Sequence, residues 1–195
     1  MAILKSLGGL EANEVVSGKG VYLRHPVMSD YANWASLRDQ SRDFLTPWEP
    51  VWPLDDLTRP AFRRRLRRYS RELKEDSSYP FFLYREADNQ LLGSAILSNV
   101  RRGVAQSCAL GYWVGEEYSG RGLMSEAVRA LIPFAFDRLG LHRIEAACLP
   151  VNEPSQKLLR RVGFQDEGTA RKYLRINGEW QDHLLFAMLA SDPRL

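Results

Sequence analysis

The chain has 195 residues, of which 45% are hydrophobic and 26% are charged, and this composition is typical of one globular domain with a buried core. A formal charge of +3 is too small to indicate nucleic-acid binding by itself, and no apolar run reaches the length of a membrane span. The start of the chain does not resemble a secretory signal, and Cys108 and Cys148 stand far apart, so the sequence favours a cytoplasmic protein.

The first part of the chain predicts two helices between strands. Residues 1–18 are glycine-rich and weakly patterned and predict a loose N-terminal arm, so the folded domain is expected over residues 19–191. Alternating apolar residues, capping side chains and prolines then predict the elements in chain order: a strand at 21–25, a helix from 29 to about 39, a proline-rich loop at 44–56 and a helix that begins after Thr58.

The second part predicts strands around two helices. Its elements are expected at 79–86, 91–100 and 104–115 (strands), 120–139 (helix), 142–150 (strand), 152–163 (helix), and 166–176 and 181–189 (strands). Asn177-Gly178 is a strong hairpin signal. Pro133 inside the long helix is expected to kink it or to cost about 3 kcal/mol. The order is that of a mixed α/β fold. Because the three histidines are scattered, no metal site is expected.

A glycine loop lies between the strand that ends near Gly115 and the helix that follows. In this context the free N–H groups at a helix start bind phosphate, Gly120 and Gly122 let the backbone approach closely, and Arg121 adds a positive charge. Neither common nucleotide motif fits, because no Lys-Ser/Thr pair follows and Ser125 replaces a third glycine. The loop alone leaves a phosphate site and an ordinary tight turn open.

Two longer stretches carry a family resemblance. VGEEYSGRGLMSEA resembles the pyrophosphate-binding signature of the GNAT superfamily of acetyl-CoA-dependent N-acetyltransferases, (Gln/Arg)-x-x-Gly-x-(Gly/Ala), which maps onto Glu117–Gly122, with Glu117 departing from the pattern. HRIEAACLPVNEPSQKLLRRVGF resembles the second signature of that superfamily. With FLTPWEP, SNVRRG, LGYWVG and YLRINGEWQDH, the chain resembles the RimJ/RimL branch of ribosomal-protein N-terminal acetyltransferases, and RimJ more closely, from about Val21 to Ala190.

The resemblance implies a fold and a cosubstrate. The GNAT fold is a central, mostly antiparallel sheet with a splayed parallel strand pair and flanking helices, and the splay is expected between residues 113–115 and 146–150. Acetyl-CoA is expected in the splay, with no metal. The residues expected to bind it are Trp113, Val114, Gly115, Gly120, Arg121, Gly122, Met124, Ser125, Asn152 and Ser155.

The resemblance also implies catalytic and acceptor residues. Ser155 is expected near the thioester sulfur as the acid, because the tyrosine that many GNAT enzymes use has no counterpart in its helix; helix capping by Asn152 is the competing interpretation. Glu49 is the candidate base. Trp48, Asn99 and Tyr112 are the candidate acceptor-binding residues, although a loop anchor, a surface turn and a core strand remain alternatives for them.

Elementary acid–base chemistry favours one class of acceptor. An α-amine has a pKa of about 7.7–8.0 and a lysine about 10.4, so losing the proton at pH 7 costs about 1.2 and about 4.6 kcal/mol respectively. A site without an obvious strong base therefore suits a protein N-terminus, and the predicted function is acetylation of such an α-amine, with alanine of a ribosomal protein as the specific expectation. The alternatives are a GNAT enzyme for a small amine and a non-catalytic CoA-binding, ribosome-associated factor.

The arginine-rich helix, residues 62–75, has two interpretations. Phe62, Leu66, Tyr69 and Leu73 have the spacing of one buried face, which leaves the arginines as a solvated face. Clustered cations also attract phosphate, so the same helix could contact the ribosome or ribosomal RNA. A plain RNA-binding domain has only this helix in its favour. The sequence leaves a monomer and a homodimer open.

Overall fold

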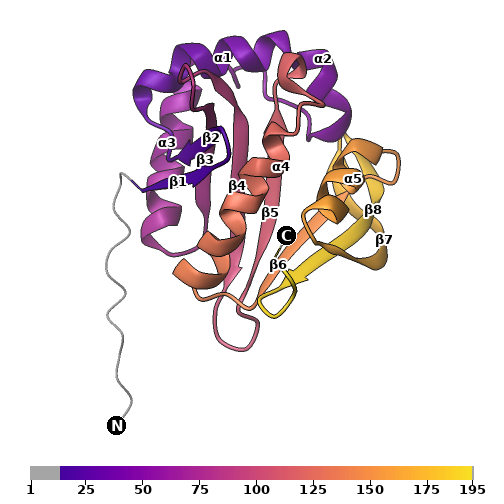
Figure 1. Cartoon of the computed structure of the whole chain (residues 1–195). Helices are drawn as coiled ribbons and strands as arrows, with labels where there is room; N and C mark the ends of the chain where they lie inside the picture. Colours follow the sequence, from indigo (N-terminus) through magenta and orange to yellow (C-terminus); the bar gives the residue numbers. More distant parts are fainter. Residues whose placement is uncertain (1–13, 195) are drawn as a thin grey trace.

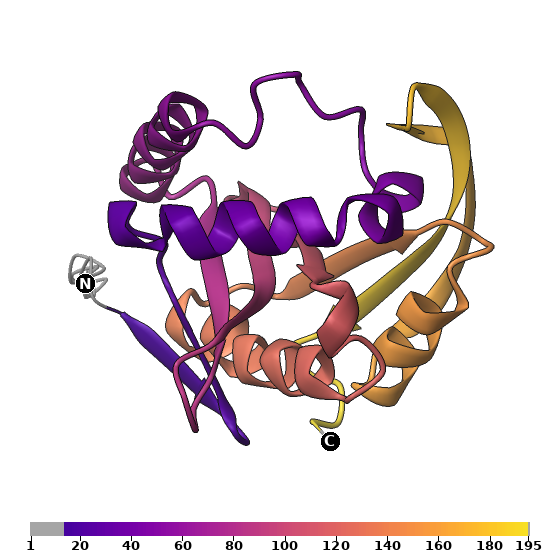
Figure 2. The same ribbon diagram turned by 90° about the horizontal axis from the view of Figure 1, so that it is seen from above.

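The computed structural model describes residues 14–194, which form one eight-stranded sheet with helices on both faces (Figures 1 and 2). The strands are β1 (Val15–Gly18), β2 (Val21–Arg24), β3 (Tyr79–Arg85), β4 (Leu91–Arg101), β5 (Ser107–Val114), β6 (Arg143–Cys148), β7 (Gln165–Ile176) and β8 (Glu179–Leu189). The α-helices are α1 (Tyr31–Gln40), α2 (Arg42–Leu45), α3 (Arg59–Lys74), α4 (Leu123–Pro133) and α5 (Glu153–Arg161). Short 3₁₀ turns cover Met28–Asp30, Thr46–Trp48 and Glu116–Tyr118.

The sheet has the strand order β1-β2-β3-β4-β5-β6-β8-β7, and β5–β6 is its parallel pair. The other neighbouring pairs are antiparallel. The expected mixed sheet of the GNAT fold is therefore confirmed. Viewed from above, α1 and α3 lie on one side of the sheet and α4 and α5 on the other (Figure 2).

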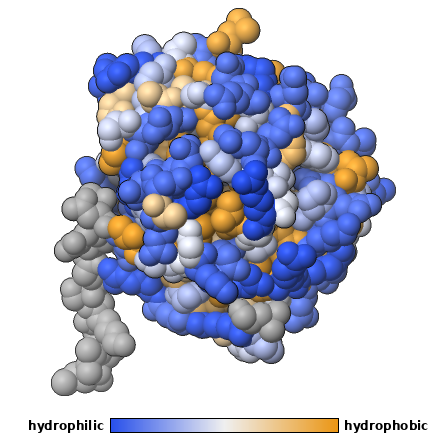
Figure 3. Space-filling view, turned by 45° about the horizontal axis from the view of Figure 1, so that its top comes forward, coloured by the Kyte–Doolittle hydropathy of each residue, from blue (hydrophilic) through white to orange (hydrophobic). Residues whose placement is uncertain are grey.

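The core is built around β3, an interior strand of the sheet that is buried on both faces. Successive side chains of a strand point to opposite faces. Phe82 packs toward Phe62 of α3 at 6.2 Å between ring centres, whereas Phe81 contacts Phe134, beyond α4, at 5.2 Å. One continuous apolar run thus joins the two helical layers. Outside this core, the face shown in Figure 3 is mostly hydrophilic, with apolar side chains in small patches.

The N-terminal boundary differs from the prediction. Residues 15–18, expected within a loose arm, form the edge strand β1, which pairs with β2 and packs under α4. Four residues of weak pattern become a strand because a neighbouring strand supplies their hydrogen bonds. The rest of the predicted arm, residues 1–13, lies outside the described residues.

The helix expected at 120–139 changes type at Pro133. It is α-helical over Leu123–Pro133 and then widens into a π-helical turn over Phe134–Arg138, in which the Leu139 N–H donates to the Phe134 carbonyl at 3.0 Å. Proline has no N–H and cannot join the regular ladder, so a change of winding at this point is physically reasonable. The turn places Phe134 against Phe81 and Tyr79.

Two local predictions are confirmed at atomic level. Thr58 caps α3 by accepting a hydrogen bond from the Ala61 N–H at 3.3 Å. Asn177 and Gly178 have positive φ angles of 44° and 85°, as a tight turn between two twisted strands requires, and they join β7 to β8. The expected proline-rich loop at 44–56 is partly helical, since α2 and the turn Thr46–Trp48 extend into it.

Candidate functional site

The site begins where the parallel pair opens. β5 and β6 pair only from Ser107 to Ala109 and from Arg143 to Glu145. Beyond these residues the strands diverge, and a cavity of about 560 Å³ lies between them, lined by residues 110–114 of β5 and by 146–149 on and just after β6. We call it the splay cavity. Its position confirms the splay expected between residues 113–115 and 146–150.

The N-terminus of α4 forms one wall of the splay cavity through Gly120, Gly122, Met124 and Ser125. Gly122 precedes the helix with φ of +77°, and the first intrahelical bond runs from the Glu126 N–H to its carbonyl at 3.1 Å. The N–H groups ahead of Glu126 have no partner within the helix and carry the positive end of its dipole. A Cβ at Gly120 or Gly122 would meet open space, so an anion can approach the backbone closely.

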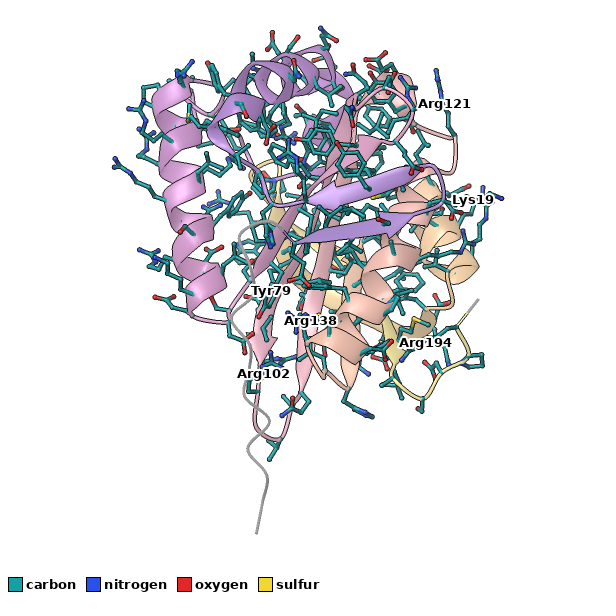
Figure 4. The ribbon with its side chains drawn as sticks, turned by 60° about the vertical axis from the view of Figure 1, so that its left-hand side comes forward. Lys19, Tyr79, Arg102, Arg121, Arg138 and Arg194 are labelled. Carbon is teal, nitrogen blue, oxygen red and sulfur yellow. The ribbon has the colours of Figure 1, made fainter. Side chains whose placement is uncertain are left out.

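Two residues expected at the cosubstrate do not line the cavity. Arg121 is exposed and projects away from the loop (Figure 4). Gly115 is buried, and a Cβ there would lie 2.4 Å from Leu37 Cδ1, so this glycine is required for packing between β5 and α1. The other residues predicted to bind the cosubstrate, including Trp113, Val114, Asn152 and Ser155, do line the cavity.

A hydroxyl pair spans the splay cavity. Tyr112 on β5 and Ser155 in the first turn of α5 have their hydroxyl oxygens 2.8 Å apart. Asn152 caps α5 by accepting a hydrogen bond from the Ser155 N–H at 3.1 Å, which holds Ser155 at the helix start. Burial raises the pKa of Tyr112, so the phenol stays protonated at neutral pH and can donate. The capping interpretation of Asn152 is therefore confirmed, and Ser155 still faces the cavity.

A buried arginine organises the loop that carries Glu49. Both Nη atoms of Arg38 donate to the Glu49 carboxylate at 2.7 Å, and Trp52 Nε1 donates to the same carboxylate at 2.7 Å. The Arg38 guanidinium also stacks 3.9 Å from the Trp52 ring centre and 4.9 Å from that of Trp113. Glu49 lines the splay cavity, as expected of a site residue, but its oxygens already accept three hydrogen bonds.

A second cavity of about 630 Å³ adjoins the first, and we call it the outer cavity. Trp48, Leu149 and Ile176 line both. The rest of its wall comes from the 47–48 turn, the residues after β6 and the β7–β8 hairpin: Pro47, Pro150, Val151, Lys172, Asn177, Glu179, Gln181 and Asp182. A hydrogen bond of 2.9 Å from the Asn177 N–H to the Glu49 carbonyl ties the hairpin to the loop. Trp48 thus lies in a cavity wall, whereas Trp52 anchors its loop.

The structure does not bring Asn99 to the site. It is exposed, with φ of +51°, beside the irregularity in β4 near Arg101, and it lines neither cavity. Asn99 lies away from the site because it is near the β4–β5 turn, and that turn is at the end of the sheet where β5 and β6 are still paired. Glu145, on β6, pairs with Arg101 at 2.7 Å and with Arg143 at 2.9 Å.

Sequence reasoning missed two residues. Arg38 lies in α1 and His183 in β8, and each reaches the site only through tertiary packing. The one usable signal was the position of Arg38 four residues after the apolar Trp34, which puts both side chains on one face of α1.

Within residues 14–194, no helix combines the length and apolarity needed to cross a membrane. No group of three or more His, Cys, Asp and Glu residues is arranged to hold a metal ion in this described part of the chain.

Comparison with known proteins extends these observations. Residues 21–165 match the family model for the acetyltransferase (GNAT) domain. The chain is 39% identical over 153 residues to the [ribosomal protein uS5]-alanine N-acetyltransferase of Escherichia coli K12, covering 78% of this chain and 79% of that one.

Two solved structures have the same fold at 32% identity. The ribosomal-protein-S5-alanine acetyltransferase from Vibrio fischeri has a TM-score of 0.85, with 92% of this chain and 98% of that chain covered. Mycobacterium smegmatis RimJ, in complex with CoA-disulfide, has a TM-score of 0.83, with 91% and 85% covered.

Proposed function

Because the chain belongs to the GNAT family of acetyltransferases, we propose that it transfers an acetyl group from acetyl-CoA to the N-terminal α-amine of a protein. The specific acceptor we propose is alanine at the start of a ribosomal protein. The relatives at 32–39% identity whose names state that activity support the choice.

The observation that carries the proposal is the junction of the two cavities at Trp48, Leu149 and Ile176. The splay cavity suits acetyl-CoA, since the α4 N-terminus offers N–H donors to its pyrophosphate and the diverging strands leave room for the pantetheine arm. The outer cavity lies at the other side of the junction and is open to chain entry. An acetyl donor and an acceptor can therefore meet from opposite sides.

The walls of the outer cavity favour a peptide. Trp48, Pro150 and Val151 offer apolar surface, and the carboxylates of Glu179 and Asp182 attract a protonated α-amine. An opening of about 630 Å³ bounded by a hairpin and a loop accommodates several residues in extended form. A small amine needs only one enclosed acidic pocket, and the wide outer cavity does not favour that alternative.

In the proposed reaction, Ser155 protonates the departing sulfur and Tyr112 donates in turn to Ser155. The backbone near Val114 holds the pantetheine and the thioester oxygen, because preorganised N–H donors stabilise the charge that develops there. Glu49, which the sequence suggested as the base, holds the acceptor loop in place through its ion pair with Arg38.

The basic face of α3 supports a ribosomal acceptor. Arg63, Arg67, Arg71 and Lys74 are exposed and form no ion pair with any residue from 14 to 194, whereas Arg64, Arg65 and Arg68 pair with acids. The three arginines of this face recur every four residues, so they line one stripe of the helix. We propose that the stripe contacts ribosomal RNA while the substrate N-terminus enters the outer cavity. Contact with ribosomal RNA and acetylation of a ribosomal protein would both take place in the cytoplasm, which is the location we propose.

The proposal is tested by CoA release from acetyl-CoA with a peptide that begins with alanine and contains one internal lysine, and with its N-blocked twin. Release with the free peptide alone, and a mass gain on its first residue, is the expected result. Release with both peptides would move the acceptor to lysine. Release with neither, while calorimetry shows CoA binding, would favour a small amine or a non-catalytic CoA-binding factor.

A further inference from the structure

His183 lines the splay cavity on the same strand as residues of the outer cavity. It is buried, at 2% exposure, and lines the splay cavity together with Tyr112 and Ser155. Its neighbours on β8, Gln181 and Asp182, line the outer cavity. An acceptor that reaches the splay cavity from the outer cavity therefore enters a space that this imidazole lines.

Hydrogen bonding selects the tautomer of His183. Its Nδ1 lies 3.0 Å from the backbone carbonyl of Gln181, and a carbonyl can only accept. Nδ1 therefore carries the proton in the neutral ring, which leaves Nε2 with a free lone pair. Tyr173 packs edge-on against the ring, with centroids 5.8 Å apart, and restricts its rotation.

The contrast with His25 shows that His183 Nε2 is open rather than sealed. His25 has the same anchor, with Nδ1 2.7 Å from the Pro80 carbonyl, but its Nε2 is a buried atom without a partner. Within residues 14–194, His183 Nε2 makes no hydrogen bond to a side chain or a carbonyl. Unlike His25 Nε2, however, it is not fully enclosed by protein atoms. Its free lone pair is thus accessible from the cavity that the ring lines.

Glu49 is less suited to take a proton. Its carboxylate accepts hydrogen bonds from both Nη atoms of Arg38 and from Trp52 Nε1. Protonation of Glu49 would leave the Arg38 guanidinium, whose side chain is only 7% exposed, without its counter-charge. The carboxylate holds the loop and the tryptophans in place, and a different group must serve the amine.

We propose that His183 is the general base of the acetyl transfer, an inference that rests on the proposed function. As the α-amine nitrogen forms its bond to the thioester carbonyl carbon, the proton it loses goes to His183 Nε2. The carbon–sulfur bond breaks with its electron pair on sulfur, and the sulfur takes a proton from Ser155 Oγ, which Tyr112 replenishes. The products are the acetylated amine and CoA–SH, and His183 and Tyr112 return to their starting states by exchange with solvent.

A histidine base implies a pH-dependent rate. The titratable or charged groups that share the splay cavity with His183 are Glu49, Tyr112, Tyr118, Cys148, Lys157 and Arg161. Burial raises the pKa of both Tyr112 and Cys148, so these two stay neutral as the pH rises from 6 to 8. Tyr173 packs against the ring from β7, and the charged neighbours of these two residues in the chain, Lys172 and Asp182, line the outer cavity.

The test compares His183→Gln, Glu49→Gln and wild type with the alanine peptide at pH 6 to 9. His183→Gln is expected to lower kcat by about 10²–10³ at pH 7, with a smaller loss at pH 9, while CoA affinity in calorimetry stays unchanged. His142→Gln is the matched control, because His142 is exposed and lines neither cavity. Wild-type kcat in His183→Gln, or a pH-dependent loss confined to Glu49→Gln, would overturn the proposal.

A second readout needs no turnover and no folded variant. Long-range ¹H–¹⁵N spectra of the wild-type protein report which imidazole nitrogen carries the proton. The Nδ1–H form is expected for His183, with its signal shifting when CoA is added, and the Nε2–H form would overturn the proposal. If wild-type protein acetylates no peptide but His183 has the expected tautomer, the proposed acceptor fails and the base assignment survives for another amine.

Discussion

The Tyr112 and Ser155 hydroxyl oxygens lie 2.8 Å apart, so β5 and the start of α5, which form two walls of the splay cavity, are joined by a proton-donating pair. Neither residue is fully buried, and both face the cavity. The pair supplies a proton donor where α5 has no tyrosine, since Leu158 and Leu159 occupy the turn after Ser155.

Ser155→Ala is expected to lower kcat by about 10²-fold or more, within the range for a positioned proton donor, and to weaken CoA binding by less than about tenfold. Tyr112→Phe should lower kcat less, and the double variant should lose less than the product of the two single losses, because the hydroxyls act in series. Steady-state kinetics and calorimetry measure both quantities. Full turnover in Ser155→Ala would leave Ser155 with only its place beside the Asn152 cap.

Gly122→Glu is expected to abolish acetyl-CoA binding. A carboxylate near 4 Å from the pyrophosphate costs about 4 kcal/mol at an effective dielectric constant of 20, equal to about a thousandfold in affinity. Gly140→Glu is the matched control, because Gly140 also has a positive φ, of 66°, and open space around its Cβ position but lies away from both cavities. Equal CoA affinity of the two variants in calorimetry would contradict the phosphate site.

Arg38→Ala is expected to destabilise the protein by about 3 kcal/mol, because it leaves Glu49 without its partner in a largely buried setting. The acceptor loop should loosen, so the KM for peptide should rise as well. Arg42→Ala is the control: Arg42 also stacks on Trp52, at 4.9 Å, but is half-exposed, and its loss should cost less than about 1 kcal/mol. Equal shifts in urea midpoint for the two variants would argue against an organising role for Arg38.

His25 makes stability depend on pH. Burial lowers its pKa in the folded protein, so the unfolded chain binds the proton more readily. The stability that the neutral ring contributes is therefore present at pH 7 and is lost as the pH falls through the unfolded pKa of about 6.5, with a slope of at most about 1.4 kcal/mol per pH unit for one proton. His25→Asn should reduce the change in urea midpoint between pH 7 and pH 5. An equally large change in wild type and variant would contradict this assignment.

The basic stripe of α3 should act in ribosome contact and not in chemistry. Reversing Arg63, Arg67 and Arg71 to Glu should weaken binding to ribosomes at low salt and reduce its salt dependence, while peptide turnover stays at the wild-type rate. A triple reversal at Arg138, Arg160 and Arg194, which lie on other elements, makes the same change in net charge. Equal ribosome binding by the two triple variants would show that net charge alone is responsible.

Local features of the fold could be predicted from the sequence because each depends on neighbours within a few residues. The Thr58 cap, the Asn177-Gly178 turn and the helix that follows Gly122 all have this character, and all are present. The family signatures extended the prediction to the splay between β5 and β6, since they span the strand, the loop and the helix that surround it.

Only the tertiary structure decided which distant side chains meet. Arg38 and Glu49 come from a helix and a loop, and His183, Ser155 and Tyr112 line one cavity from three different elements, so no local sequence pattern predicts these groupings. Asn99 and Arg121 illustrate the same point: each sits in a motif that predicted a site residue, but its side chain is exposed and lines neither cavity. Periodicity determines which face a residue occupies, whereas the register and divergence of the strands determine what that face meets.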